Sequence, residues 1–337
     1  SLYNFSNTDL IDYFERKNVT LTEINDGKIF PASLRAQDIL NPLLDDCAAH
    51  NVEIKYSEPA QSVVYSGGQF TVETGKGNYH SANLMIVTGG KSYPSTGSTG
   101  EGHRFARDLG HSVTETGPAL TSVIIRNYGM SDCAGIAIRE GTVHLFRNGK
   151  KVREQSGDIL FTHKGLSGPA ILNMSRYIRA DDFIKIQMTE TRQPDELEKI
   201  LIDAAAESGG RSVRNIITSH AIPDRVAAAV MNAAKLPVDF PLSRLDKRKR
   251  RFIAECVTGM PLEVEKLGDY NEAMATRGGV DLREVNPRSM ESRLVPGLFF
   301  GGEVLDVDGD TGGFNLQFAF SSGRAAADHM TKLNPQK

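Results

Sequence analysis

Residues 298–315 read LFFGGEVLDVDGDTGGFN, and they combine an apolar strand, a glycine pair, an acid, a glycine-rich turn and the start of a helix. A carboxylate that follows a strand, such as Glu303 or Asp306, can accept hydrogen bonds from the hydroxyls of a sugar-like chain. A helix that begins at Gly313 directs its unpaired N–H groups and its positive end outward, where they stabilise negative charge. The stretch therefore predicts a cofactor-binding arrangement within an α/β fold.

A calcium loop and a plain acidic surface turn are the alternatives for this stretch. Asp306, Asp308 and Asp310 alternate as they do in an EF-hand loop, with Gly309 near the required glycine. The twelfth position counted from Asp306 is Gln317, however, where an EF-hand has an acid. The sequence favours the cofactor role, and we assign no metal ligand.

A second glycine cluster follows another apolar strand, Leu84–Thr88. Residues 88–102 read TGGKSYPSTGSTGEG and lead into a helix expected from about His103 to Leu109. The spacing matches neither GxGxxG nor a P-loop, so a phosphate cradle and a flexible loop both stay open. Ligands of open α/β sheets bind beyond the carboxyl ends of strands, and we therefore expect both glycine clusters at one rim.

The composition is that of an ordinary globular protein. The chain has 337 residues, a net charge of −3 and no Trp, which excludes a disordered tail and a generally basic nucleic-acid binder. Three widely spaced cysteines without a CxxC argue against a disulfide framework and a zinc site, and they fit a reducing compartment. No apolar run approaches the roughly 18 residues of a membrane helix. We expect a cytoplasmic protein with no membrane partner.

Periodicity predicts an order of elements in which the two ends are α/β and the middle is β, then α. The first part holds helices up to Phe14, capped by Asn7 or Thr8, and over 34–49, then strands at 52–56, 62–65, 69–73, 78–80 and 84–88. A hairpin at Asn148-Gly149 marks a β region, and helices are expected at 194–208, 213–220, 224–235 and 245–257. This order predicts one nucleotide-type domain, 1–120 with 275–337, that carries a β-barrel-like insertion at 121–192 and a helical insertion at 193–274.

Several motifs together resemble a bacterial family of flavoproteins, often called NAD(P)/FAD-dependent oxidoreductase or aminoacetone-oxidase-like. The match runs in the family's order over nearly the whole chain. The motifs are Thr88-Gly89-Gly90-Lys91-Ser92-Tyr93-Pro94 with Gly97 and Gly100, Gly117-Pro118-Ala119-Leu120, Phe161-Thr162-His163 with Gly165-Leu166-Ser167-Gly168-Pro169, Gly278-Gly279-Val280, Gly302-Glu303 to Asp308-Gly309, Gly312-Gly313-Phe314-Asn315 and Ser321-Ser322-Gly323.

The resemblance implies a glutathione-reductase-type FAD-binding domain with an inserted β-barrel and helical domain. It implies that Gly302 and Glu303 lie near the ribityl and diphosphate groups, and that residues 312–315 (Gly312, Gly313, Phe314 and Asn315) lie against the isoalloxazine. Thr88, Gly89 and Gly90 would form a second contact with FAD, and Ala60 would lie near the adenine. Lys91 and Tyr93 would face the flavin rim or pack the loop.

The family begins with a βαβ unit that carries GxGxxG, and this chain shows neither that unit nor the glycine-rich stretch that follows it. Such a unit holds a pyrophosphate at a helix N-terminus. The chain also starts at Ser1. We therefore expect an N-terminally incomplete member of the family.

His163, between an apolar strand and a glycine-rich loop, is our candidate catalytic residue, with a structural histidine as the alternative. The basic run Lys247-Arg248-Lys249-Arg250-Arg251 covers most of a helix circumference, which favours a solvated face over an RNA-binding stripe. We predict an FAD-dependent oxidoreductase that transfers hydride between the flavin and a small-molecule substrate, with either NAD(P)H or the substrate reducing the flavin. A flavin-dependent RNA-modifying protein and a cofactor-free fragment without activity are the alternatives. The substrate, the preferred nicotinamide and the oligomeric state stay open.

Overall fold

The computed structural model describes residues 4–24, 27–191, 193–208 and 210–333. The chain divides into two compact units, 1–117 with 275–337 and 118–274. Where the chain passes from one unit to the other it forms two short strands, β7 (Gly117–Ala119) and β14 (Ala275–Arg277).

The core of the first unit surrounds a pair of parallel strands, β6 (Leu84–Ile86) and β15 (Leu298–Phe300). Leu298 aligns with Leu84 and Phe300 with Ile86, although more than 200 residues separate the strands in sequence. Phe299 and Phe300 are fully buried, together with Phe70 and Val304. An all-apolar strand of this kind requires cover on both faces.

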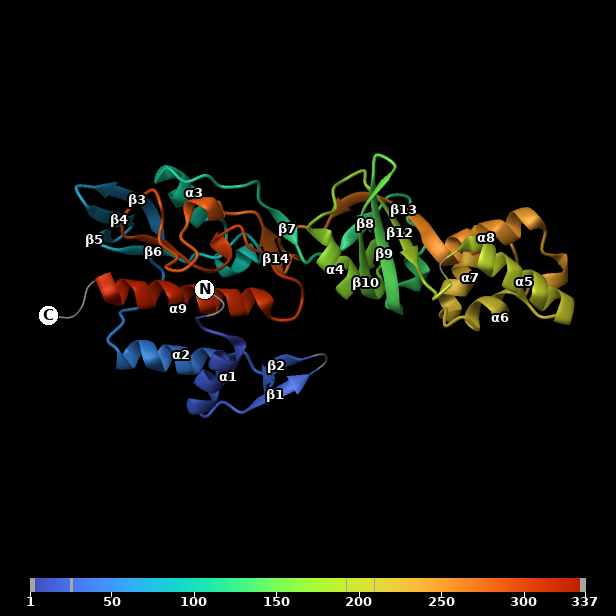
Figure 1. The fold of residues 1–337 in the computed structure, drawn as a ribbon, viewed down its shortest axis with the longest axis horizontal. Coiled ribbons are helices and arrows are strands. Elements are labelled where there is room, and N and C mark those ends of the chain that lie inside the picture. The colour runs from blue at the N-terminus through green and yellow to red at the C-terminus, as the bar shows by residue number, and fades with distance from the viewer. Residues whose placement is uncertain (1–3, 25–26, 192, 209, 334–337) are drawn as a thin grey trace. The chain divides into compact units, whose positions relative to one another are not determined.

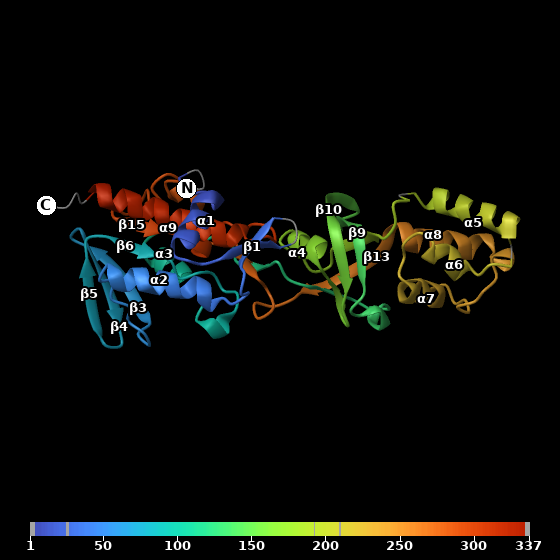
Figure 2. The same ribbon diagram turned by 90° about the horizontal axis from the view of Figure 1, so that it is seen from below.

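An antiparallel sheet of three strands and one long helix provide much of that cover. The sheet consists of β3 (Ala60–Ser66), β4 (Gln69–Thr74) and β5 (Gly77–Ser81), which Figure 2 shows side by side. Helix α9 (Phe314–Leu333) packs against β15 and also contacts α1 (Asn7–Arg16), which lies below it in Figure 1. The rings of Phe14 and Phe320 meet edge to face between these two helices, with centroids 6.0 Å apart.

The remaining elements of the first unit are short. They are the hairpin β1 (Leu21–Ile24) with β2 (Lys28–Pro31), helices α2 (Gln37–Ala49) and α3 (Glu101–Asp108), and the 3₁₀ turns η1 (Pro94–Thr96), η4 (Leu282–Glu284) and η5 (Gly302–Val304). No helix within the described ranges has the length and apolar character to cross a membrane.

The second unit contains a closed six-stranded barrel in the order β10-β11-β8-β13-β12-β9. Its long hairpin joins β9 (Ala137–Arg147) to β10 (Lys150–Phe161) through Asn148 and Gly149, as the sequence predicts. The other strands are β8 (Val123–Ile125), β11 (Gly165–Ser167), β12 (Phe183–Gln187) and β13 (Met260–Leu267). The turn η2 (Ser131–Cys133) precedes β9, and helix α4 (Pro169–Ser175) follows β11.

The helical part of the second unit lies between β12 and β13 in sequence. It comprises α5 (Pro194–Ser208), α6 (Val213–Thr218), α7 (Asp224–Ala233), η3 (Leu242–Arg244) and α8 (Lys247–Gly259). Strand β13 falls inside the range 193–274 that we predict as helical, so the end of that range is wrong: β13 pairs with β12 and β8 and closes the barrel. The predicted boundary at residue 192 falls outside the described residues.

Two further predictions are corrected in the first unit. The alternating segment Val52–Tyr56 forms no strand, and Val52, Ile54 and Tyr56 are all exposed. A strand needs a hydrogen-bonded neighbour, and no such partner is found for this segment among the described residues. The helix cap is also different: Ser6, rather than Asn7 or Thr8, caps α1 through a capping box with Asp9.

Candidate functional site

The two glycine clusters meet at one rim, as the sequence predicts. Because β6 and β15 are parallel and in register, the loops that follow them leave the same edge. The Gly301 N–H also donates to the Ile86 carbonyl at 3.2 Å, which extends the pairing beyond the strands. Thr88, Gly89 and Gly90 therefore lie beside Gly301, Gly302 and Glu303.

The Glu303 carboxylate ties this rim together. Its Oε2 accepts from the Gly90 N–H at 3.3 Å, and its Oε1 accepts from the Thr276 N–H at 2.5 Å. Burial raises the pKa of Glu303 above its usual value, against the lowering effect of these two N–H donors. Each carboxylate oxygen retains acceptor capacity for one further hydrogen bond.

Thr276 connects the rim to the rest of the first glycine cluster. Its Oγ1 accepts from the backbone N–H groups of Lys91, at 2.8 Å, and Ser92, at 3.2 Å. A Cβ on Gly90 would lie 2.4 Å from this same Oγ1, so only glycine allows the loop to approach so closely. Residues 90–92 are thus held by Thr276 and Glu303, two positions that are far away in sequence.

The first turn of α3 carries a buried histidine that we did not predict. His103 is 1% exposed, and both of its ring nitrogens are buried. Burial, followed by the positive charge of Lys91, lowers the pKa of His103. The only sequence signal for His103 is its place directly after the glycine cluster.

The loop 306–315 is held by its own side chains. Asp306 Oδ2 accepts from the Thr114 hydroxyl at 2.9 Å. The Asn315 side chain pairs with the backbone of Gly309, accepting from its N–H at 2.7 Å and donating to its carbonyl at 3.3 Å. Asp306 and Asn315 therefore already act as scaffold, whereas the Phe314 ring is 61% exposed and free to meet a ligand.

The other predicted site residues occupy separate places. Tyr93 has a left-handed backbone and an exposed ring at the start of η1. Ala60 begins β3 and lines a cavity of about 420 Å³ with Glu58, Val72, Thr74 and Tyr79. His163 is exposed in the turn between β10 and β11 of the second unit, and its catalytic role stays a prediction.

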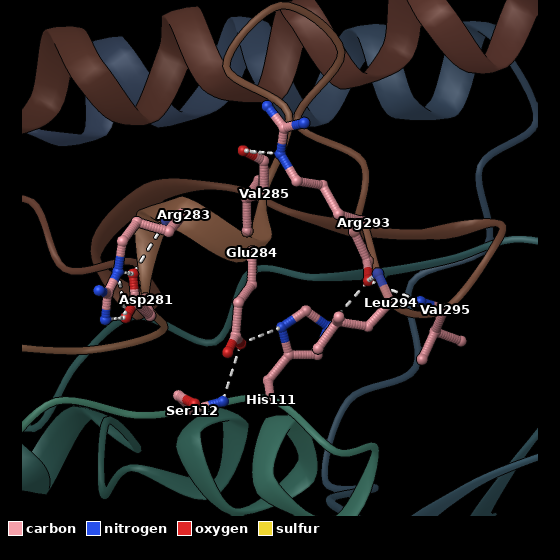
Figure 3. Close-up of polar contacts among 10 residues, drawn as sticks. His111, Ser112, Asp281, Arg283, Glu284, Val285, Arg293, Leu294 and Val295 are labelled. Atoms are coloured by element: carbon pink, nitrogen blue, oxygen red, sulfur yellow. Dashed lines mark hydrogen bonds and ion pairs between the residues drawn. The ribbon is translucent and has the colours of Figure 1, made fainter.

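A second polar network, also missed by sequence reasoning, surrounds His111 in the first unit (Figure 3). The His111 Nδ1 lies 3.1 Å from Glu284 Oε2, and its Nε2 lies 2.8 Å from Ser292 Oγ. The ring packs edge to face on Phe300, with centroids 4.9 Å apart. This network therefore touches β15, which leads directly to Glu303.

The basic run at the start of α8 is partly neutralised. Arg250 and Arg251 lie 3.6 Å and 3.1 Å from Glu198 of α5, and Arg251 also contacts Glu255 at 2.8 Å. Lys247 and Arg248 are exposed. In the part of the chain that the structure describes, no group of three His, Cys, Asp or Glu side chains is arranged to hold a metal.

One family model and three known proteins are similar to this chain over almost its whole length. The family model for the HI0933-like protein Rossmann domain matches residues 1–329. A protein of Escherichia coli strain K12 named ribosomal RNA dihydrouridine synthase is 31% identical, over 98% of this chain and 80% of that protein. A Haemophilus influenzae protein of the same name is 27% identical, over 97% and 80%. A 3-dehydro-bile acid delta(4,6)-reductase of Clostridium scindens is 25% identical, over 97% and 82%.

Proposed function

This chain belongs to the HI0933-like Rossmann-domain family, and from that premise we propose that it is an FAD-dependent reductase. We propose that its substrate contains a carbon–carbon double bond conjugated with a carbonyl group. The observation that carries the proposal is the rim at which Glu303 bridges the loops that follow β6 and β15.

The residues of the rim suit a flavin dinucleotide. The half-buried Glu303 carboxylate would accept hydrogen bonds from ribityl hydroxyls with the acceptor capacity that Gly90 and Thr276 leave unused. The start of α9 at Phe314 would direct its unpaired N–H groups toward the ring, where they would stabilise negative charge. When bound, the flavin would supply the hydride chemistry; the protein would supply orientation and electrostatics.

The names of two relatives support this substrate class. Reduction of a 3-dehydro-delta(4,6) bile acid and formation of dihydrouridine both saturate a carbon–carbon double bond in conjugation with a carbonyl. In such a reaction hydride adds to the carbon remote from the carbonyl, a proton adds to the adjacent carbon, and NADH or NADPH is oxidised. We propose that this chain catalyses the same addition of one hydride and one proton, with oxidation of NADH or NADPH, in the cytoplasm.

Glu303→Gln tests the cofactor assignment. Gln offers one acceptor oxygen in place of a charged carboxylate, and hydrogen bonds to charged groups contribute about 1.5–3 kcal/mol, so we expect flavin affinity to fall about tenfold or more. The measurement is flavin binding by fluorescence and by absorbance near 450 nm. The control is Asp328→Asn, which removes a surface carboxylate paired with Arg324 on α9. Equal affinity in the two variants would contradict the role of Glu303.

An RNA-modifying enzyme is the second candidate, favoured by the names of two relatives and by the exposed Lys247 and Arg248. In this case Lys247→Ala with Arg248→Ala should weaken RNA binding and reduce its salt dependence. Lys150→Ala with Lys199→Ala, which removes two exposed charges elsewhere in the second unit, is the matched control. Equal RNA binding by both double variants would argue against this second candidate.

A further inference from the structure

The network around His111 joins three segments of the first unit. His111 and Ser112 follow α3, Glu284 ends η4, and Ser292 begins a turn that leads to β15. Glu284 Oε2 accepts from the Ser112 N–H at 2.8 Å as well as facing His111 Nδ1. Ser292 also donates its backbone N–H to the Leu298 carbonyl at 2.7 Å. Figure 3 shows the His111 ring between Glu284 and the turn at Leu294 and Val295.

The hydrogen-bond donors and acceptors define the protonation state of His111. Ser292 Oγ accepts from the N–H groups of Leu294 at 3.0 Å and Val295 at 2.8 Å, so its single proton is donated to His111 Nε2. The one remaining proton of a neutral ring then lies on Nδ1, which faces Glu284 Oε2 at 3.1 Å. The ring is therefore neutral when all these bonds are satisfied.

This Ser–His–Glu arrangement has the order of a hydrolytic triad but not its exposure. Ser292 is 8% exposed, and its oxygen already accepts two backbone N–H groups. A nucleophile must reach its substrate through a free lone pair. The arrangement is suited to hold backbone in place rather than to attack a substrate.

Among the residues that the structure describes, Glu284 is the one direct ionic partner of His111. On the same segment Arg283 pairs with Asp281, and the Arg293 side chain donates to the Val285 carbonyl at 3.4 Å. From α9, His329 lies 3.4 Å from Glu291, and from β15 the Phe300 ring packs on His111. Burial lowers the pKa of His111 against the opposing effect of Glu284, which agrees with a neutral ring.

We propose that His111, held by Glu284 and Ser292, is a positioning residue for the Glu303 rim, and that it works only while its ring is neutral. A proton on Nε2 would turn this acceptor into a donor facing the Ser292 hydroxyl, and the turn that precedes β15 would open. Since β15 continues into Gly301, Gly302 and Glu303, the rim would loosen with it. The consequence for flavin rests on the proposed function, whereas the pH-dependent opening does not.

Hydrogen exchange of the peptide 290–303 tests the opening in the ligand-free protein. We compare wild type with His111→Gln at the same pH, so that the intrinsic exchange rates cancel. A histidine whose pKa is lowered in the fold stabilises the fold above its unfolded value, near 6.5, and this stabilisation is lost as pH falls through the folded pKa. We therefore expect the protection advantage of wild type to be largest above about pH 6.5 and to shrink by at most about tenfold per pH unit below it.

Controls separate this mechanism from simple packing. His50→Gln removes an exposed histidine at the end of α2, outside the measured peptide, and it should keep the wild-type pH dependence. Should His111→Gln fail to fold, Glu284→Gln gives a second test: it removes the charge that favours the imidazolium, and the imidazole titration followed by NMR should move to lower pH. A protection advantage that is constant with pH, or a titration that Glu284→Gln leaves unmoved, would overturn the proposal.

Flavin binding distinguishes the two proposals. If both hold, the flavin affinity of wild type falls toward acid pH more steeply than that of His111→Gln. If wild type binds no flavin at any pH, the proposed function fails, and the exchange experiment still decides the role of His111.

Discussion

Gly90 is the residue at which a single methyl group should have the greatest effect on the rim. In Gly90→Ala the new Cβ would lie 2.4 Å from Thr276 Oγ1 and 3.1 Å from Glu303 Cδ. We expect overpacking to destabilise the first unit by about 1–3 kcal/mol and to displace Glu303. Urea unfolding and flavin binding measure the two effects.

Gly323→Ala is the matched control. Gly323 lies inside α9, and nothing lies within 4 Å of the Cβ that it would gain. Replacing an unhindered helical glycine by alanine should stabilise the protein by about 0.5–1 kcal/mol. A loss of stability in Gly323→Ala, or no loss in Gly90→Ala, would contradict this description of the rim.

Candidate site residues could be predicted from sequence where a local sequence pattern marks them. Glu303 follows an apolar strand directly, and that position alone indicates a ligand-facing acid. Thr276 and His111 could not be found in this way, because their partners lie far away along the chain and no spacing rule connects them. For Asp306 the structure adds a partner that no local pattern reveals: Thr114 donates to its Oδ2 at 2.9 Å, and its contact with a ligand stays a prediction.

At the scale of elements, the capping box of α1 distinguishes Ser6 from Thr8, two hydroxyl-bearing residues near the start of the helix. The Asp9 N–H donates to Ser6 Oγ at 3.3 Å, and the Ser6 N–H donates to Asp9 Oδ2 at 2.7 Å. Ser6→Ala should therefore lower the free energy of unfolding by about 1 kcal/mol. Thr8→Ala, inside the helix, should change it by less than about 0.5 kcal/mol. Equal losses of unfolding free energy in the two variants would contradict the assignment of Ser6 as the helix cap.

Helices and hairpins could be predicted where their own sequence carries the hydrophobic pattern and the turn signal. The hairpin at Asn148-Gly149 and the helices of the second unit fall close to their expected ranges. Val52–Tyr56 has the alternation of a strand, but alternation cannot supply a neighbouring strand, and the segment stays unpaired. Strand β13 was missed as a barrel strand because its partners, β12 and β8, precede the helices in sequence.

At the scale of the whole molecule, each compact unit has a hydrophobic core of its own. The core of the second unit includes Ile159, Phe161 and Ile184, all fully buried. Residues 118–274 expressed alone should therefore fold and unfold cooperatively in urea. Ile159→Ala in this fragment should lower its free energy of unfolding by about 2–5 kcal/mol, because a buried cavity replaces the side chain.

The matched variant for this fragment is Val152→Ala, on the exposed part of β10. It should have little effect on stability, because its side chain is already in contact with water. A fragment that unfolds gradually, or one in which both variants behave alike, would show that the second unit depends on the rest of the chain.

The pairing of β6 with β15 also determines how late during translation the rim can form. The ribosome releases Thr88, Gly89 and Gly90 early, yet their partners Gly302 and Glu303 emerge only after the entire second unit. A nascent chain that stops before residue 298 lacks half of the rim, however well its earlier segments have folded. If the rim binds a cofactor as proposed, only chains whose translation has passed the second unit can bind it there.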